Sequence, residues 1–432
     1  MYVSDCLTLN EKGHLAIGGC DTVDIASAFG TPAYVYDENE IIANCRAFSK
    51  SVERCYGGNG MVLYASKAFC CKEICRICGR EGLGLDVVSG GELFTALSAG
   101  FDPRRIYFHG NNKTHAELCQ ALENGVGRIV VDNIFELRHL SELAARYVKT
   151  AEILLRIKPG IDAHTHDFIK TGQIDSKFGF ALETGEAMQA VKTALQLENI
   201  SLAGVHCHIG SQIFDIDPFE LAARVMLDFI AAAKAETGFE IRELNLGGGF
   251  GIQYLKSDRP TPFEDYMEKV SEVIKSYSGQ LGVKTPFVLI EPGRAIVGAA
   301  GITLYTVGAV KEIPDVRTYV SVDGGMGDNP RYVLYQSRYE VVCANKAAEK
   351  RDFTATVAGK CCESGDLIQE WTHIQPVEPG DILAVLSTGA YNYSMASNYN
   401  RICRPPVIMV KDGQPRVVVK RETFEQLTQN DI

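Results

Sequence analysis

The 432-residue sequence lacks several features by which membrane, secreted and nucleic-acid-binding proteins are recognised. No apolar run approaches the ~20 residues that a membrane-spanning helix needs. Met1–Asp5 has neither the basic region nor the apolar stretch of a secretory signal. Basic residues are also few, since 43 Lys and Arg against 54 Asp and Glu give a net charge of −11, which would repel a nucleic acid. We therefore expect a cytoplasmic protein that acts on a small molecule and binds neither nucleic acid nor membrane.

The fourteen cysteines are scattered along the chain, which favours a reduced, cytoplasmic protein. Cys71, Cys75 and Cys78 have the spacing of one helical face, and we interpret them as a buried face and not as a metal site. The sequence also has no internal repeat and no low-complexity linker. Its length and its 46% of hydrophobic residues predict a globular protein of two domains.

Apolar, β-branched runs alternate with segments of helical pattern over much of the chain. Eight such runs are each followed by a helical segment, which is the order of a (β/α)8 barrel. The runs are Met61–Ser66, Gly84–Ser89, Arg105–Phe108, Arg128–Asp132, Glu152–Ile157, Ala203–His208, Glu243–Leu246 and Pro286–Ile290.

A ninth run, Ala33–Asp37, has to be left out of an eight-stranded barrel. Omitting it places a polar residue or a glycine at or just past the C-terminal end of seven strands, where barrel enzymes carry their chemistry. These residues are Lys67, Asp86, His109, Asp132, His208, Gly247 and Glu291. We therefore assign residues 1–37 to a second domain that the chain rejoins later.

After Arg294 the pattern changes to short strands between turns such as Asp323–Gly325 and Glu378–Gly380. Short strands with such turns are typical of an all-β domain. We expect an α/β protein in which an N-terminal segment joins the β-domain and a TIM-like barrel is followed by a C-terminal all-β domain. The expected ranges are 1–37 for the segment, 38–294 for the barrel and 295–432 for the β-domain.

Five short segments in a fixed order supply an amine, a flat ring, a backbone cradle, a carboxylate and a thiol. Together these groups can hold pyridoxal 5'-phosphate and protonate a carbanion formed on it. Each segment alone is a weak signal, whereas five in one order are a strong one. The segments are Tyr64–Ala68, His206–Gln212, Gly247–Gly251, Glu291–Arg294 and Cys362–Asp366.

Lys67 ends an apolar run, which would place its amine between a low-dielectric wall and the barrel mouth. Burial lowers the pKa of an amine and leaves it nucleophilic toward an aldehyde. The alternative is an ordinary surface lysine, which is the more frequent situation for this residue type.

His206 and His208 are two residues apart on one strand, so their side chains point to the same side. A metal site is one interpretation, but it needs further ligands, and no convincing set follows in the sequence. We favour a histidine ring that stacks on an aromatic cofactor, and we expect no metal. Asp162–Asp167 has a more metal-like composition, and we interpret it as a loop near the barrel mouth.

Gly247–Gly249 follow the seventh run, and their backbone could approach a phosphate because β-carbons are absent. The alternative is that these glycines form a tight turn.

Glu291 beside a pyridine nitrogen would keep that nitrogen protonated, and Arg294 could bind a substrate carboxylate. The alternative is that Glu291 and Arg294 form a local ion pair. The thiol of Cys362 could donate a proton to a carbon atom of the substrate. The alternative is that Cys362–Asp366 is an ordinary turn in which the cysteine only packs.

With these segments in place, the chain resembles the alanine-racemase-like (fold type III) class of pyridoxal-phosphate enzymes, and within it the diaminopimelate decarboxylases. The resemblance extends from about Thr31 to about Arg404. Further segments that carry it are Leu85–Glu92, His109–Lys113, Thr171–Gln173, Ser176–Gly179, Asn329–Arg331 and Gly389–Tyr391.

The resemblance implies a role for each site residue. Lys67 would bind the cofactor aldehyde, His208 would stack on the ring, and Cys362 would donate the proton; these three are the expected catalytic residues. The implied cofactor-binding residues are Lys67, Asp86, His208, Ser211, Gly248, Gly249, Glu291, Gly293, Arg294 and Tyr391. The implied substrate-binding residues are Arg294, Arg331, Tyr335, Glu363 and Tyr391.

The implied reaction is decarboxylation of meso-2,6-diaminopimelate at its D-centre to L-lysine and carbon dioxide, the last step of lysine biosynthesis. In this family Cys362 and Glu363 would reach the pocket of a neighbouring subunit, so a homodimer with shared active sites is implied. Two departures from the family pattern are minor: Phe69 stands where Asn is common, and Tyr332 stands where Pro is common.

Three alternatives remain open at this point. The first is a decarboxylase of the same class that acts on ornithine, arginine or lysine, although such relatives commonly have Asp where this chain has Glu363. The second is a barrel that binds pyridoxal phosphate without catalysis, but such proteins lack a β-domain. The third is a metal hydrolase on the same barrel.

Overall fold

The computed structural model describes residues 2–161 and 176–432, and the chain divides into two compact units. We describe each unit by itself under a fixed name. The barrel unit consists of Cys45–Gly251 and Pro260–Gly293, and the β-unit consists of Met1–Asn44, Ile252–Arg259 and Arg294–Ile432.

The barrel unit contains eight parallel strands that close into a cylinder, because β13 pairs with β5 and β8 pairs with β9. The sequence prediction of a (β/α)8 barrel is therefore confirmed. A two-residue strand, β10 (Phe180–Ala181), adds to β9 and was not predicted. The barrel strands are β5 (Gly60–Ala65), β6 (Gly84–Val87), β7 (Ile106–Phe108), β8 (Arg128–Val131), β9 (Ala151–Lys158), β11 (Ile200–His206), β12 (Glu243–Asn245) and β13 (Phe287–Ile290).

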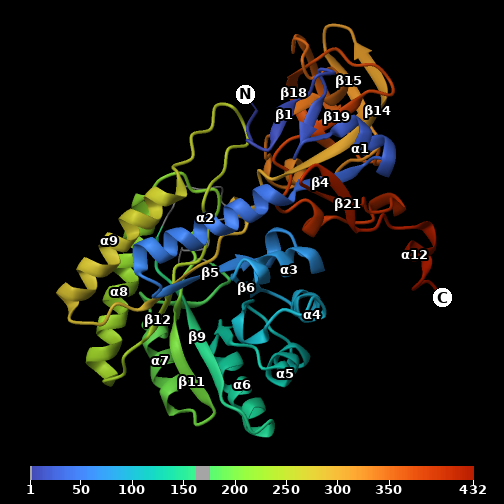
Figure 1. Cartoon of the computed structure of the whole chain (residues 1–432). Helices are drawn as coiled ribbons and strands as arrows, with labels where there is room; N and C mark the ends of the chain where they lie inside the picture. The colour runs from blue at the N-terminus through green and yellow to red at the C-terminus, as the bar shows by residue number, and fades with distance from the viewer. Residues whose placement is uncertain (1, 162–175) are drawn as a thin grey trace. The chain divides into compact units, whose positions relative to one another are not determined.

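Helices cover the outside of the barrel strands (Figure 1). Several begin directly after a strand because a polar N-cap ends the loop: Ser89, Thr114 and Asn133 each accept a backbone N–H of the first helical turn. None of the described helices combines the length and apolar character needed to cross a lipid bilayer. The helices are α2 (Glu38–Tyr56), which starts in the β-unit, α3 (Lys72–Arg80), α4 (Gly90–Ser98), α5 (His115–Asn124), α6 (Ile134–Arg146), α7 (Glu186–Gln196), α8 (Asp217–Thr237) and α9 (Phe263–Leu281).

The predicted cysteine face lies on α3. Cys71 is the N-cap residue, and Cys75 and Cys78 are buried on the inner side of the helix. None of the three belongs to a potential metal-binding group among the residues that the structure describes. Their role is packing, which is the usual role of a buried free cysteine.

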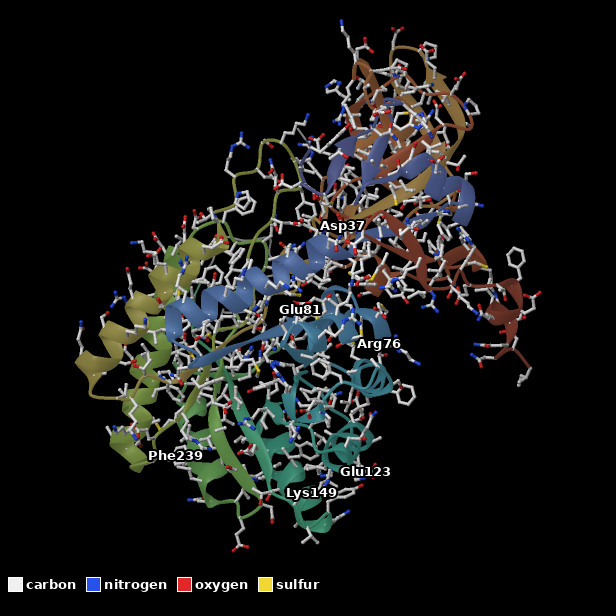
Figure 2. The ribbon with its side chains drawn as sticks, viewed as in Figure 1. Asp37, Arg76, Glu81, Glu123, Lys149 and Phe239 are labelled. Carbon is white, nitrogen blue, oxygen red and sulfur yellow. The ribbon has the colours of Figure 1, made fainter. Side chains whose placement is uncertain are left out.

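The two ends of the barrel differ in the connections that they carry. Glu123, Lys149 and Phe239 lie in or beside helix-to-strand connections, and Figure 2 shows them gathered at one end of the barrel. The interior is filled by side chains such as Leu63, Val130 and Leu289, so the barrel is a packed core and not a pore. The polar residues of the predicted site therefore lie at the opposite end, where the strands terminate.

The β-unit contains a second sheet in the order β18-β17-β15-β14-β4-β20-β21, in which β19 also pairs with β14 and β16 pairs with β19. All five residues of β4 (Ala33–Asp37) are buried, so this strand has the composition of a barrel strand. It instead pairs antiparallel with β14 and parallel with β20. The other strands are β14 (Gly301–Ile313), β15 (Arg317–Val322), β16 (Val341–Cys343), β17 (Phe353–Ala358), β18 (Leu367–Ile374), β19 (Ile382–Val385), β20 (Val407–Lys411) and β21 (Gln414–Val419).

Several small elements of the β-unit were not predicted, because short runs carry little periodicity. A separate three-stranded sheet lies near the N-terminus and is followed by a short helix. The unpredicted elements include the strands β16, β18 and β21 and also β1 (Leu7–Leu9), β2 (Leu15–Ile17), β3 (Cys20–Asp21), α1 (Thr22–Phe29), α10 (Arg294–Val297), α11 (Arg331–Tyr335) and α12 (Phe424–Thr428).

A buried carboxyl group makes the stability of the β-unit sensitive to pH. Burial raises the pKa of Asp328 to about 7, and the carboxylate of Asp366 adds to the shift. Between the ordinary pKa of aspartate and about 7, the folded chain holds a proton that the unfolded chain lacks. The free energy of unfolding should therefore fall as pH rises through this window, by at most ~1.4 kcal/mol per pH unit for this group.

Asp328→Asn should remove this contribution and flatten the pH dependence. Denaturation of both proteins at several pH values between about 5 and 8 tests the prediction. Asp352→Asn, at an exposed position, is the matched control and should keep the wild-type slope. Equal slopes for wild type and Asp328→Asn would show that Asp328 is not the titrating group.

Candidate active site

Lys67 lies in a short turn (Ser66–Ala68) directly after β5, at the strand end predicted from sequence. Its Nζ is 3.1 Å from Oδ2 of Asp86, which lies on the neighbouring strand β6. Asp86 is fully buried, whereas 37% of the Lys67 side chain is exposed. A buried carboxylate thus holds an amine that a small molecule can still reach.

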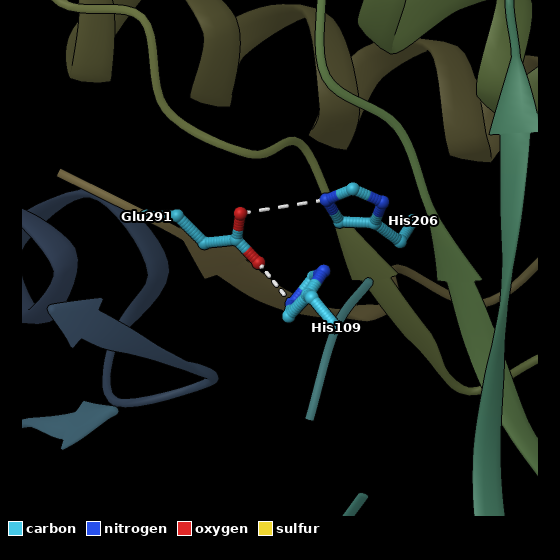
Figure 3. A group of neighbouring side chains, drawn as sticks. All are labelled: His109, His206 and Glu291. Carbon is cyan, nitrogen blue, oxygen red and sulfur yellow. Dashed lines mark hydrogen bonds and ion pairs between the residues drawn. The ribbon is translucent and has the colours of Figure 1, made fainter. Parts of the chain in front are cut away.

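Glu291 follows β13 and is at the centre of a buried polar cluster (Figure 3). Its Oε1 accepts a hydrogen bond from Nδ2 of Asn245 at 2.7 Å and lies 2.8 Å from Nε2 of His109. Its Oε2 lies 3.4 Å from Nε2 of His206. None of these four side chains is more than slightly exposed, so the carboxylate is held in a fixed orientation.

The electrostatics of this cluster favour a charged Glu291. Burial alone would raise the pKa of Glu291, but its contacts with His109 and His206 outweigh burial and hold the pKa well below its usual range. Burial lowers the pKa of His206 to about 3, although Glu291 opposes this shift. Glu291 is therefore a buried negative charge that can act on a positively charged group of a ligand.

His109 extends the network from Glu291 towards Lys67. Its Nε2 lies 3.7 Å from Oδ1 of Asp86, in addition to the contact with Glu291. The strand ends of β5, β6, β7 and β13 thus contribute one connected set of charged groups. This connection explains why polar residues follow several adjacent strands of the barrel.

His109, His206 and Glu291 are also the group of described residues whose ligand atoms are close enough to hold a metal ion. The sequence interpretation found no further ligands for His206, and this was wrong, because the strand ends bring His109 and Glu291 to it. Oε1 of Glu291 already accepts the N–H of Asn245 and contacts His109. The geometry therefore fits a polar network better than a metal site.

His208 lies two residues beyond the end of β11 and is half-buried. The backbone N–H of Gly248 donates to its Nδ1 at 3.2 Å, so Nδ1 carries no proton. Burial, together with the charges of Lys67 and Arg156, holds the pKa of His208 well below its ordinary value. The ring is therefore neutral and fixed in orientation, as a stacking partner for an aromatic ring should be.

The glycine run after β12 forms a backbone surface from which side chains are excluded. A β-carbon on Gly248 would lie 2.1 Å from the carbonyl oxygen of Glu291, and one on Gly249 would lie 2.6 Å from that of Gly210. Gly249 also has a φ of +113°, which other residues rarely adopt. Ser211, beside Gly210, is half-buried, so this surface presents a hydroxyl and backbone without side chains to a phosphate.

These groups fit pyridoxal phosphate. The barrel end offers a reachable amine, a neutral flat ring, a buried carboxylate and a glycine cradle in which a β-carbon has no room. Gly293 closes the turn after Glu291, where a β-carbon would lie 3.0 Å from that of Ala65.

The β-unit contains a second cluster, in which two arginines surround a tyrosine. Arg294 and Arg331 both donate through Nη1 to the phenol oxygen of Tyr254, the latter at 3.0 Å. Arg331 also donates to Tyr339 at 2.9 Å. The ring of Tyr391 lies 4.8 Å from the guanidinium carbon of Arg294. Buried guanidinium groups in such an arrangement can bind a carboxylate.

Three other predicted residues lie near this cluster or in an exposed loop. Tyr335 is half-buried with its ring 6.0 Å from the guanidinium carbon of Arg331. Cys362 and Glu363 are both exposed. Their loop is anchored by buried Asp366, which accepts the backbone N–H groups of Met326 at 2.6 Å and Cys361 at 2.7 Å.

Sequence reasoning missed Asn245, Tyr254 and Tyr339. Asn245 stands two residues before the glycine run, where a polar residue inside an apolar strand was an available signal. Tyr254 and Tyr339 had no such signal, because only the fold brings them to Arg331. The predicted loop Asp162–Asp167 and the segment Thr171–Gln173 lie outside the described residues.

Comparison with known proteins agrees with this geometry. Residues 38–298 match the family model of the pyridoxal-dependent decarboxylases, pyridoxal binding domain. The fold and the site thus define a decarboxylase of the (β/α)8 class, and the cofactor of this class is pyridoxal 5'-phosphate, as predicted.

Relatives that match the whole chain show which family of this class the chain belongs to. The chain is 49% identical to the diaminopimelate decarboxylase of Bacillus subtilis over all of this chain and 98% of that protein, and 46% identical to that of Staphylococcus aureus over 98% of each. The crystal structure of the M. jannaschii diaminopimelate decarboxylase in co-complex with L-lysine superposes with a TM-score of 0.92 at 35% identity, covering 100% of this chain and 99% of that one. The chain therefore belongs to the diaminopimelate decarboxylase family, and the predicted resemblance is confirmed.

Proposed function

We propose that this protein converts meso-2,6-diaminopimelate into L-lysine and carbon dioxide with pyridoxal phosphate as cofactor. The observation that carries the proposal is the Lys67–Asp86 pair beside the buried Glu291 cluster, in a chain that is similar over its whole length to named diaminopimelate decarboxylases. The reaction consumes one proton, which replaces the departing carboxyl group on carbon. It is the last step of lysine biosynthesis.

Each residue at the barrel end has a proposed task. When bound, pyridoxal phosphate supplies an electron sink for the carbon that loses carbon dioxide. Lys67 binds its aldehyde, and Asp86 holds the amine in place. Glu291 holds a proton on the ring nitrogen because its own negative charge is buried beside it.

The remaining cofactor contacts are made by backbone and ring groups. Gly249 and Ser211 bind the phosphate through an N–H and a hydroxyl group, and Gly248 leaves room for it because it has no side chain. His208 packs its neutral ring on the cofactor. Gly293, Arg294 and Tyr391 complete the pocket, as the resemblance implies.

The substrate is an amino acid at both ends, so its far end brings one carboxylate and one amine. Arg294 and Arg331, with Tyr335 and Tyr391, bind that carboxylate, and Glu363 binds the amine. Cys362 gives its thiol proton to the carbon that has lost carbon dioxide. A substrate with only an amine at its far end would leave two buried guanidinium groups without a carboxylate, which argues against ornithine or arginine.

We also propose a cytoplasmic location and domain ranges of 1–37, 38–294 and 295–432.

We further propose a homodimer in which Cys362 and Glu363 of each subunit reach the active site of the neighbouring subunit. The exposure of both side chains in a single chain supports the shared site. Analytical ultracentrifugation tests the dimer. Mixing a Lys67→Ala chain with a Cys362→Ala chain tests the sharing, because only a shared site restores part of the activity.

Glu291→Gln should retain the cofactor but lose about 10²–10³-fold in turnover, because the variant keeps the shape of the side chain and removes its charge. Turnover and cofactor absorbance measured on the same sample separate the two effects. Glu142→Gln, at an exposed position of α6, is the control and should behave as wild type. Unchanged turnover in Glu291→Gln would mean that this charge does not act on the cofactor.

A turnover assay tests the proposed reaction. Purified holoenzyme should release lysine and carbon dioxide from meso-diaminopimelate and turn over ornithine, arginine and lysine far more slowly. Faster turnover of one of those three would replace the proposed substrate with the alternative from the same class. Activity that needs a divalent cation and resists removal of the cofactor would contradict the mechanism.

A further inference from the structure

Tyr254 lies between two buried arginines of the β-unit. Its phenol oxygen accepts hydrogen bonds from Nη1 of Arg294 and from Nη1 of Arg331, the latter at 3.0 Å. The guanidinium carbons lie 5.7 Å and 5.4 Å from its ring centre. Tyr254, Arg294 and Arg331 are each at most 7% exposed, so water contributes little to these contacts.

The hydrogen bonds of Tyr254 suit a phenolate better than a phenol. The oxygen accepts two N–H groups, and no acceptor for its own O–H is found among the residues that the structure describes. A buried O–H without an acceptor costs about 1–3 kcal/mol. A phenolate avoids that cost and gains two hydrogen bonds from charged donors.

The charge of Arg331 leads to the same conclusion. Within the described part of the chain no carboxylate lies at ion-pair distance from it, and its hydrogen-bond partners are the phenol oxygens of Tyr254 and Tyr339. A buried permanent cation requires a negative partner. Burial would raise the pKa of Tyr254, but Arg294 and Arg331 outweigh burial and lower it. Tyr339, whose ring is edge-on to that of Tyr254 with 5.5 Å between the ring centres, is a further titratable group that faces it.

We propose that Tyr254 is ionised in the substrate-free enzyme and is the counter-anion of Arg294 and Arg331, and that the far carboxylate of the substrate replaces it in that role. On replacement, the phenolate oxygen takes up one proton from solvent, and no other bond forms or breaks. The new O–H can then donate to the substrate carboxylate. This inference rests on the proposed function, because it needs a ligand that carries a carboxylate at its far end.

The exchange would make Tyr254 a specificity-determining residue. A ligand with a far carboxylate brings its own negative charge and releases Tyr254 from its role as counter-anion. A diamine brings no negative charge, so the phenolate stays in place and the arginines gain no new partner. Proton uptake on binding should therefore accompany carboxylate ligands only.

The test uses the holoenzyme at neutral pH with two probes: L-lysine, which has the carboxylate, and 1,5-diaminopentane, which lacks it. Free wild-type enzyme should show the ultraviolet absorbance of tyrosinate, and Tyr254→Phe should lack it. L-lysine should abolish this absorbance with uptake of up to one proton per site, whereas the diamine should leave it in place. Proton uptake is measured in weakly buffered solution with a pH indicator.

Tyr277→Phe is the matched control, because Tyr277 is a tyrosine on α9 of the barrel unit that donates to Asp228 and to neither arginine. It should behave as wild type. Identical neutral-pH spectra of wild type and Tyr254→Phe, or L-lysine binding that leaves the absorbance unchanged, would overturn the inference. Should Tyr254→Phe not fold, the wild-type titrations with the two probes still decide, because they need no variant.

The two proposals fail in different ways. Tyrosinate absorbance in an enzyme that does not bind L-lysine would support an ionised Tyr254 but overturn its exchange with the substrate, together with the proposed substrate. Turnover of diaminopimelate without tyrosinate absorbance would support the proposed function and overturn this inference.

Discussion

Lys67→Ala should give a folded protein that has lost the yellow absorbance of a lysine-bound cofactor and more than about 10³-fold in turnover. The reason is that Lys67 is the amine that Asp86 holds at 3.1 Å at the end of β5, in a position that remains partly exposed. Alanine removes both the covalent attachment and the positive charge beside Asp86. Absorbance spectra and lysine production measured on one preparation test this prediction.

Lys72→Ala is the control for this experiment. Lys72 is exposed at the start of α3, five residues from Lys67, and contacts neither Asp86 nor Glu291 in the described structure. Its replacement should leave both absorbance and turnover unchanged. Retained lysine-linked absorbance in Lys67→Ala would show that another amine holds the cofactor.

Cys362→Ala should keep the cofactor and lose about 10²–10⁴-fold in turnover, because only the donation of a proton is impaired. The thiol is exposed in a loop that Asp366 anchors through two backbone hydrogen bonds. Cofactor absorbance and steady-state rates on the same sample separate loss of cofactor from loss of proton transfer.

Cys403→Ala, a partly buried cysteine of the same unit, is the matched control and should turn over normally. Normal turnover in Cys362→Ala would make this thiol structural, and the proton would then have to come from another group. Loss of cofactor in the variant would indicate that the loop supports the pocket and does not deliver a proton.

The barrel could be predicted from sequence because its strands are apolar runs that alternate with segments of helical pattern, three of which begin with a polar N-cap. The strand β4 shows the limit of such patterns. All five of its residues are buried, so composition alone does not distinguish it from a barrel strand, and its exclusion depended on where Lys67 and Glu291 would otherwise fall. The short strands β1–β3 and β10 were missed because two or three residues show no period.

Site residues could be predicted where a single segment contains both the reactive group and the sequence pattern that places this group at the end of a strand. Lys67 and the glycine run are of this kind, and their roles stay predictions until the variants are measured. Contacts between distant segments were not predictable. Arg331 is 77 residues from Tyr254, and His109 is far in sequence from Glu291. Only the fold therefore shows that these groups are in contact.

The central claim is that Lys67 holds the cofactor covalently. Reduction of the holoenzyme with borohydride, followed by proteolysis and mass spectrometry, tests it most directly. The account predicts that the peptide containing Lys67 carries the mass of the reduced cofactor and that trypsin no longer cleaves after this residue. The same mass on a different lysine, or none on the Lys67 peptide, would contradict the account.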